Sequence, residues 1–235
     1  GRLSLDDRLT VLKIDKVPGS GQLQHLHDGA EITVRDAAWL MTTISDNTAT
    51  NLLLDRIIIR RVWDKMEALG LKNTKVHSKT FLRNSSVAMD SSVKYGLGVT
   101  TPNEMARLFE LLARGRAVSA TADSAMLDML EHNEDGQMLQ RFAGGVRAAH
   151  KTGATDAVRT ECGTDRRRRR CLARRDVQLD ESDDFLGHER SPELLQLLDL
   201  QEVQLDRCGA AEDGHHHLDG GPVLVDFIHE PGEVR

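Results

Sequence analysis

The sequence predicts a mostly helical protein that also carries at least one clear strand, and three observations support this. Capping residues precede several apolar runs with helical spacing, and glycines follow two of these runs. A later segment, residues 146–155, is typical of a strand. The chain has 235 residues, which is enough to bury a full core as one large domain or two small ones.

The first predicted elements lead up to a strong helix start. Residues 1–15 mix helical and strand spacing, so we expect a short helix or an extended connector there. Turns are indicated at residues 17–21 and 27–29. Thr33 and Asp36 then form a capping box of the S/T-x-x-D/E type. The helix that follows has an apolar stripe that we expect in the core, made of Ala37, Ala38, Leu40, Met41 and Ile44.

The tripeptide Ser45-Asp46-Asn47 interrupts this helix, because Ser, Asp and Asn side chains bond to local backbone instead of continuing a helix. We expect Asn47 or Thr48 to cap the next helix. The buried stripe of that helix is predicted to be Leu52, Leu53, Leu54, Ile57 and Ile58. The tripeptide would then lie on a turn between two buried helices, presenting three polar side chains. The alternative is that these residues are helix caps and nothing more.

Further along, the pattern alternates between helices and one long polar stretch. A helix over residues 62–69 is stopped by Gly70. Residues 72–98 are polar and irregular, which favours a functional loop. Thr101 and Pro102 open the next helix, whose buried face is predicted to be Met105, Leu108, Phe109, Leu111 and Leu112. Gly115 ends this helix, and another is predicted over residues 120–130.

Composition and charge exclude several classes of protein. A net charge of −6 and a pI near 5.9 argue against a general nucleic-acid binder. No apolar run is long enough for a membrane span. Three cysteines do not make a disulfide framework. The chain starts at Gly1 without a signal peptide, so we interpret it as a mature form, a fragment or a truncated reading.

The last third differs from the rest in composition. Lysine, Asn, Met, Trp and Tyr are all missing after Lys151, while Arg166 to Arg170 form an unbroken basic run. Such a run can be a solvated or nucleic-acid-facing tail. We favour another interpretation, in which a GC-rich gene is read out of frame from near Gly163. Residues 164–235 would then be an atypical Arg-, Asp- and His-rich tail that is disordered. The triple histidine at residues 215–217 has no second ligand cluster and does not indicate a metal site.

Two motifs together give the clearest indication of function. Ser45-Asp46-Asn47 is followed about a hundred residues later by Lys151-Thr152-Gly153, and in this order they match two of the three elements of class A β-lactamases and penicillin-binding proteins. The sequence resembles this family over residues 1–163. The resemblance implies an α+β fold, here a partial catalytic domain with a helical subdomain, a loop and the K-T-G strand, and an incomplete antiparallel sheet. It implies no cofactor and no metal.

The resemblance also assigns roles to residues. Ser45 and Lys151 would be catalytic: Ser45 would pass a proton to the leaving nitrogen, and Lys151 would set the charge around the substrate carboxylate. Asp46 would be chiefly structural. Substrate binding would fall to a second set, consisting of Asn47, Asn84, Thr152, Gly153, Ala154 and Arg159. Within it, Asn47 would contact the substrate amide, Thr152 the carboxylate, and the Ala154 N–H the oxyanion.

The sequence departs from the family at the nucleophile. The family's S-x-x-K precedes its S-D-N, which would place the nucleophile before Gly1. The S-x-x-K found here, Ser91 to Lys94, follows S-D-N in a stretch read as irregular loop, and we interpret it as a chance match. His150 and Asp156 do not indicate a Ser-His-Asp triad, because His150 would face away from the neighbouring Lys151 on a strand.

A second departure concerns hydrolysis of the acyl-enzyme. Residues 80–84 match the E-x-x-L-N pattern that supplies the deacylating base, with Asn84 in place but Thr80 where Glu is expected. A hydroxyl is not basic enough to replace a carboxylate. Deacylation would therefore be slow, as in a penicillin-binding protein.

These observations predict a β-lactamase-like serine hydrolase that opens β-lactam amides through an acyl-enzyme and is inactive as this chain. Its partners would be small molecules, a β-lactam or a D-alanyl peptide, and by resemblance it would be periplasmic or secreted. The alternatives are a D-Ala-D-Ala peptidase, a degenerate binding domain without catalysis, and nucleic-acid binding through the arginine run, which would weaken steeply with salt.

Overall fold

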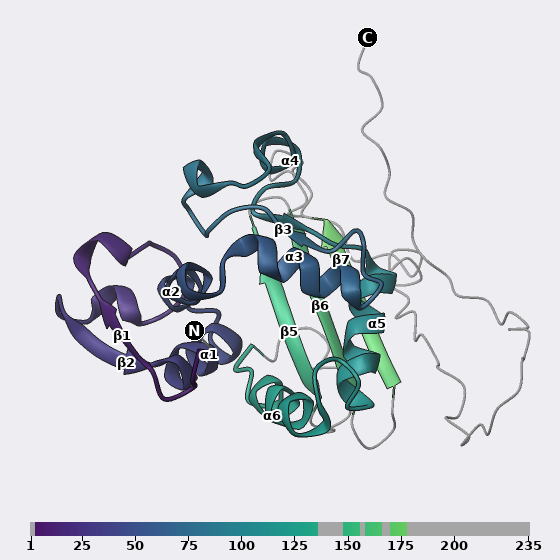
Figure 1. Cartoon of the computed structure of the whole chain (residues 1–235). Coiled ribbons are helices and arrows are strands. Elements are labelled where there is room, and N and C mark those ends of the chain that lie inside the picture. The colour runs from purple at the N-terminus through teal and green to yellow at the C-terminus, as the bar shows by residue number, and fades with distance from the viewer. Residues whose placement is uncertain (1–2, 136–147, 156–157, 166–169, 178–235) are drawn as a thin grey trace, which may run out of the picture.

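The computed structural model describes residues 3–135, 148–155, 158–165 and 170–177. Two parts lie side by side in it (Figure 1). The amino-terminal part, purple to blue in Figure 1, contains a two-stranded hairpin and two helices. The other part contains a three-stranded sheet, green in Figure 1, with helices packed against it.

The amino-terminal part is built from a hairpin packed on two helices. Its elements are β1 (Arg8–Val11), η1 (Lys13–Asp15), η2 (Leu23–His25), β2 (Ala30–Thr33), α1 (Val34–Thr43) and α2 (Asn47–Ile57). β1 and β2 pair antiparallel, so the start of the chain is extended and then forms a short 3₁₀ turn. The predicted capping box of Thr33 and Asp36 is confirmed. Buried apolar residues from all four main elements form one core, with Leu9, Val11, Leu23, Ala37 and Leu53 among them.

Two details at α2 differ from the prediction. Asp46 is the cap, not Asn47 or Thr48: its backbone is extended and its carboxylate accepts the Ala49 N–H at 2.9 Å. The predicted apolar stripe is buried at Leu52 and Leu53, whereas Ile57 and Ile58 are exposed. The reason is that α2 ends at Ile57, and Ile58 turns the chain away with a φ of 69°.

The middle of the chain contains more regular structure than the sequence predicted. It forms α3 (Ile59–Ala68), β3 (Lys75–Val76), η3 (Arg83–Ser85), α4 (Met89–Tyr95), β4 (Gly98–Val99), α5 (Pro102–Ala113) and α6 (Ala120–Glu131). The stretch read as an irregular loop is therefore interrupted by α4 and by the short pair of β3 and β4. Thr101 caps α5 as predicted, by accepting the Glu104 N–H at 3.2 Å.

The sheet consists of β5 (Ala149–Ala154), β6 (Val158–Asp165) and β7 (Arg170–Val177), in that order and antiparallel. One face packs on α5 and α6, where Ala149 joins the cluster of Leu111 and Leu112, and Cys162 joins Phe109. The predicted strand over residues 146–155 is confirmed by β5 at residues 149–154, while residues 146 and 147 lie outside the described residues.

The predicted domain boundary at residue 163 falls inside β6. The register continues without a break from Gly163, opposite Leu172, to Asp165, opposite Arg170, and Thr164 is fully buried. Arg170, the last residue of the arginine run, is therefore the first residue of β7. Residues 166–169 and 178–235 of the predicted tail, with the triple histidine, lie outside the described residues.

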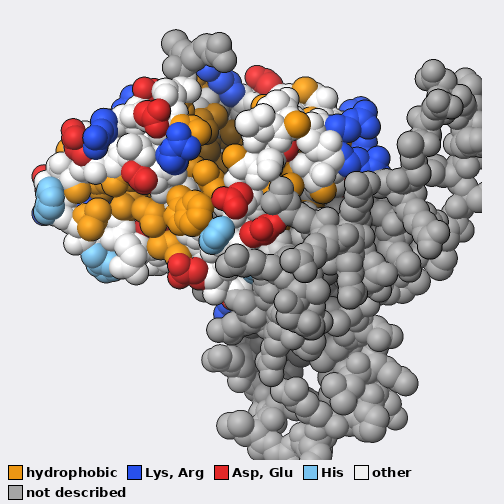
Figure 2. Space-filling model, turned by 90° about the horizontal axis from the view of Figure 1, so that it is seen from below, with side chains coloured by type: hydrophobic (Ala, Val, Ile, Leu, Met, Phe, Trp, Pro, Cys, Tyr) orange, Lys and Arg blue, Asp and Glu red, His pale blue; other side chains and the backbone are white. Residues whose placement is uncertain are grey.

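The surface of the described part mixes charge and apolar groups. Figure 2 shows apolar side chains gathered on the face seen from below, with acidic and basic side chains scattered among them. Among the described residues, no helix is long and apolar enough to cross a membrane. The same residues contain no group of three or more side chains that could hold a metal ion.

Candidate functional site

The turn between α1 and α2 is held in one conformation by Asp46. Its carboxylate is 1% exposed. It accepts three backbone N–H groups, from Gln22 at 2.6 Å, Leu23 at 3.0 Å and Ala49 at 2.9 Å. Ser45, just before it, has a φ of 56°, which is uncommon for a residue other than glycine. Asp46 thus fixes a strained turn that presents the half-buried Ser45, which supports the structural role expected for Asp46.

The turn at residues 18–21 is fastened to the same tripeptide. The Asn47 N–H donates to Ser20 O at 3.0 Å, and Asn47 Nδ2 donates to Pro18 O at 3.0 Å. Gly21 is required by this packing, because a Cβ there would lie 2.2 Å from Asp46 Cγ. Sequence reasoning identified this turn but did not connect it to the tripeptide.

Lys151 joins the sheet to that turn. Its Nζ donates to Ser45 Oγ across 106 residues of sequence, and also to the Thr152 carbonyl at 2.8 Å. Burial lowers the pKa of Lys151, and the Asp135 and Glu161 carboxylates offset part of this effect. A buried lysine with a lowered pKa, bonded to a hydroxyl, can exchange a proton with it more readily than a solvated one. The geometry therefore brings the two predicted motifs into direct contact.

His150 lies on the opposite face of the strand from Lys151. Both side chains of the pair His150 and Glu161 are fully buried, with Nδ1 and Oε1 2.5 Å apart. The predicted separation of His150 from Lys151 is confirmed. Asp156, the third residue of the rejected triad, lies outside the described residues.

The rest of β5 leads from the half-buried Lys151 to the surface. Thr152 is half-buried, and Gly153 and Ala154 are exposed. Arg159 on β6 pairs with Ala154, and by strand alternation it shares the face of Thr152. A Cβ on Gly153 would lie 2.7 Å from Thr160 Oγ1, so the close approach of the two strands requires glycine here.

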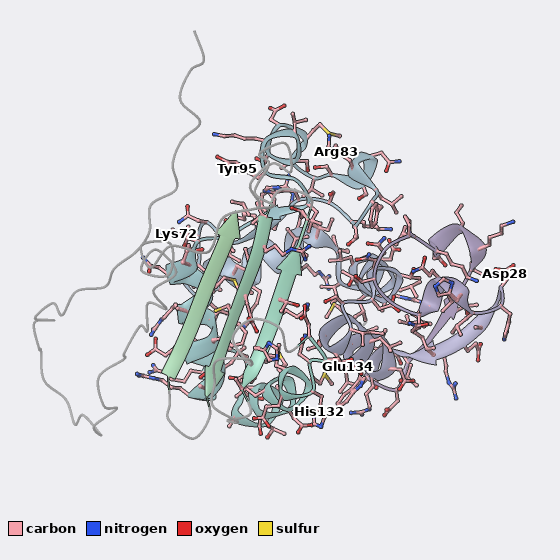
Figure 3. The ribbon with its side chains drawn as sticks, turned by 180° about the vertical axis from the view of Figure 1, so that it is seen from behind. Asp28, Lys72, Arg83, Tyr95, His132 and Glu134 are labelled. Carbon is pink, nitrogen blue, oxygen red and sulfur yellow. The ribbon has the colours of Figure 1, made fainter. Side chains whose placement is uncertain are left out.

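The loop that carries Thr80 is held by a residue that sequence reasoning missed. Asn51 is buried on α2; its Oδ1 accepts the Thr80 N–H at 2.8 Å and its Nδ2 donates to the Thr80 carbonyl at 3.0 Å. The available signal was a polar residue directly before the apolar Leu52 to Leu54. Asn84 is exposed on η3, and no described contact joins it to Ser45 or Lys151. Its neighbour Arg83 lies on the loop at the end of the molecule toward which β5 runs (Figure 3).

The S-x-x-K sequence at Ser91 lies in α4, which corrects its expected placement in an irregular loop. Lys94 is exposed, with its Nζ 4.9 Å from the centre of the Tyr95 ring. Lys94 therefore points to an exposed aromatic ring on its own helix. Nothing in this arrangement resembles the Ser45 and Lys151 contact.

Comparison with known proteins places the chain among the β-lactamases. The sequence profile of the β-lactamase enzyme family matches residues 1–170. The β-lactamase from Sphaerobacter thermophilus is similar at 36% identity, with a TM-score of 0.61, over 68% of this chain and 59% of that one. The protein PBP-A is similar at 25% identity, with a TM-score of 0.60, over 74% of this chain and 62% of that one. Among curated proteins, the sequence finds no significant match.

More distant structures share the fold. A β-lactamase from Chitinophaga pinensis has 18% identity and a TM-score of 0.61, over 76% of this chain and 70% of that one. The chain spans less than two thirds of the length of the first relatives, 59% and 62%. The predicted fold is confirmed: these residues form part of the α+β fold of class A β-lactamases and penicillin-binding proteins.

Proposed function

Because the chain belongs to the β-lactamase enzyme family, we propose that Ser45 and Lys151 form the proton-relay half of an acyl-transfer site for small anionic amides. The contact between Lys151 Nζ and Ser45 Oγ is the observation that carries this proposal. When an attacking serine opens the amide, the leaving nitrogen needs a proton as its bond to carbon breaks. Ser45 gives that proton and takes another from the Lys151 ammonium.

The substrate is held by its carboxylate and by its amide. Lys151 supplies the positive charge for the carboxylate, and this favours a β-lactam or a D-alanyl peptide. Asn47 contacts the amide, and the Ala154 N–H stabilises the oxyanion. Arg159 pairs with Ala154 and shares the face of Thr152, opposite Lys151, so the strand register does not support the expected second charge beside Lys151.

The residue at position 80 decides between rapid β-lactam hydrolysis and a slowly hydrolysed acyl-enzyme, as in a peptidase. The clamp from Asn51 fixes the Thr80 backbone, and a Glu side chain at this position could activate water whereas threonine cannot. This favours an enzyme that is acylated and then hydrolyses slowly. A mutant of the relative PBP-A is known as an acyl-enzyme complex with penicillin G.

The first experiment measures binding by the full chain. The penicillin core, 6-aminopenicillanic acid, is titrated while protein chemical shifts are followed. Binding should be lost in Lys151→Met and kept in Ser45→Ala, because Ser45 moves a proton and Lys151 holds the carboxylate. Equal binding by both variants and by the unaltered chain would contradict the proposed site.

The second experiment tests acyl transfer. Incubated with penicillin G, the chain should show no adduct by intact mass, because the site described contains no attacking serine. Fusing a segment with the family's S-x-x-K motif before Gly1 should produce an adduct. Ser45→Ala should then slow acylation by about 10²–10⁴-fold, the usual value of positioned proton transfer.

The chain that carries the added S-x-x-K segment, called the restored chain, also decides between β-lactamase and peptidase activity. Turnover of penicillin G is compared with turnover of a D-Ala-D-Ala peptide, before and after Thr80→Glu. Faster release of the penicilloyl group in Thr80→Glu supports the role given to position 80. A degenerate binding domain is the second candidate; it is favoured if ligand binds but the restored chain forms no adduct. By family membership we propose export to the periplasm or medium, which cell fractionation would test.

A further inference from the structure

Phe81 is placed where a phenylalanine is unfavourable twice over. Its side chain is 63% exposed, although it is a large apolar ring. Its φ is 60°, in the left-handed region that costs a residue with a Cβ about 1–2 kcal/mol. Leu82 N donates to Lys79 O at 3.3 Å, so Phe81 occupies the third position of a tight turn, where a positive φ normally selects glycine or asparagine.

The neighbours of Phe81 explain what this position gains. A Cβ built on Gly19 would lie 3.1 Å from Phe81 Cε2 and 2.7 Å from Asn47 Nδ2. The ring and the Asn47 amide therefore lie next to each other across Gly19, and the missing side chain at Gly19 leaves room for both. The ring forms an exposed apolar surface beside the residue assigned to the substrate amide.

The position of the ring is fixed by the loop that carries it. Asn51 bonds both backbone groups of Thr80, one residue before Phe81. Lys79, two residues before it, forms an ion pair with Asp55 of α2. These contacts hold the turn against α2 and keep Phe81 beside Asn47. Strain and exposure retained next to a functional group are characteristic of binding sites.

We propose that Phe81 is a specificity-determining residue, whose ring packs against a flat apolar side chain on the acyl side of the amide held by Asn47. This rests on the proposed function and names the substrate class of that site: amides with an aromatic acyl group. Packing one face of a phenyl ring on Phe81 should tighten binding about tenfold.

The test compares two ligands that share the penicillin core. One is 6-aminopenicillanic acid, which has no acyl side chain, and the other is penicillin G, which carries a phenylacetyl group. Dissociation constants are measured by chemical-shift titration with the full 235-residue chain. The ratio of the two constants should be about ten, and it should fall to about one in Phe81→Gly and to an intermediate value in Phe81→Leu.

A matched control and a second readout separate binding from packing. Tyr95→Leu replaces another half-exposed aromatic residue, on α4, and should leave the ratio unchanged. Phe81→Gly should unfold at an equal or higher urea concentration, because glycine suits the turn better. A ring whose role is only to cover Gly19 would show the opposite result, a loss of stability with an unchanged ratio.

The outcomes distinguish this inference from the proposed function. If the penicillin core binds and Lys151→Met abolishes that binding, but the ratio stays the same in Phe81→Gly, the role of Phe81 is wrong and the site stands. If the core does not bind at all, the proposed function is wrong and this inference falls with it.

Discussion

Asp46 has the largest structural role of any single side chain in the S-D-N turn. Asp46→Ala would leave the N–H groups of Gln22, Leu23 and Ala49 without their acceptor, two of them in buried residues. We expect a loss of about 3 kcal/mol or more in the free energy of unfolding, measured with urea. Asp36→Ala is the matched control, since it removes an exposed capping carboxylate and should cost about 1 kcal/mol. Equal losses in the two variants would contradict the role given to Asp46.

The buried Lys151 should make stability depend on pH. Its pKa is lowered in the folded protein from 10.5, so the unfolded chain binds more protons at a pH between the two values. The stability of the unaltered chain relative to Lys151→Met should therefore rise as the pH increases through that window toward 10.5. Urea unfolding of both proteins at neutral pH and at pH values through the window up to 10.5 tests this.

Lys13→Met, at an exposed position, serves as the control for that series. If the difference between Lys151→Met and the unaltered chain stays constant over the whole range, burial does not affect the lysine in the way described.

At the residue scale, the family motifs assigned Ser45 and Lys151 to one site, but the sequence predicted neither their direct contact nor the residues that hold the turn. Asn51, Gly21 and Phe81 were missed. Each lies next to a residue at least 25 positions away in the sequence: Thr80, Asp46 and Gly19, respectively. Such contacts leave no periodic pattern in the sequence.

At the scale of single elements, α2 and the loop that follows α3 behave as one unit. Asn51→Leu would remove both hydrogen bonds to Thr80 and should speed amide hydrogen exchange at Thr80 and Phe81. Asn51→Asp keeps the acceptor for the Thr80 N–H and should cause a smaller increase. Unchanged exchange in Asn51→Leu would show that other contacts hold the loop.

Helix starts were the most predictable elements. Thr33 and Thr101 cap their helices as expected, since a capping signal depends on residues within one turn. The middle segment was less predictable: β3 and β4 are each two residues long and pair across more than twenty positions, so local spacing contains no trace of them. The exposed Ile57 and Ile58 show the same limit, because the turn at Ile58 overrides the helical stripe.

At the scale of the whole molecule, the described residues of the two parts form separate apolar clusters, and polar contacts join the parts. Asn133 Nδ2 donates to Thr42 O at 2.8 Å, Glu134 N donates to Thr43 O at 2.9 Å, and the rings of Trp39 and His132 are 5.0 Å apart. His132 and Glu134 lie where the end of α6 meets the amino-terminal part (Figure 3). Further links between the two parts join Lys151 to Ser45, Asn51 to Thr80, and Lys79 to Asp55.

This arrangement predicts that Asn133→Ala weakens the coupling between the two parts, because it removes one of the bonds that join them. The chain has two tryptophans, Trp39 on α1 and Trp63 on α3, so single-tryptophan variants report on each part separately. In the unaltered chain their urea midpoints should coincide, and in Asn133→Ala they should separate, with a loss of about 1 kcal/mol. Coincident midpoints in both proteins would mean that the clusters unfold together without this bond.

The whole-molecule arrangement was predicted only through the family resemblance. Helical and strand patterns gave no information on the order β5-β6-β7 or on the pairing of Arg159 with Ala154. The composition of the last third predicted a boundary at residue 163, because the charged residues begin there. Composition contains no information on the strand pairing, which continues past that point to Asp165 opposite Arg170.

The close approach of Gly21 to Asp46 has a consequence for mutational surveys of this chain. Every side chain at position 21 would collide with the buried carboxylate that shapes the turn. A saturation library sorted only for soluble expression should therefore be depleted at position 21 as strongly as at any core position. Ser45 and Lys151 should tolerate replacement in that screen and be depleted only under antibiotic selection in a restored gene. Position 21 would otherwise be mistaken for a reactive residue.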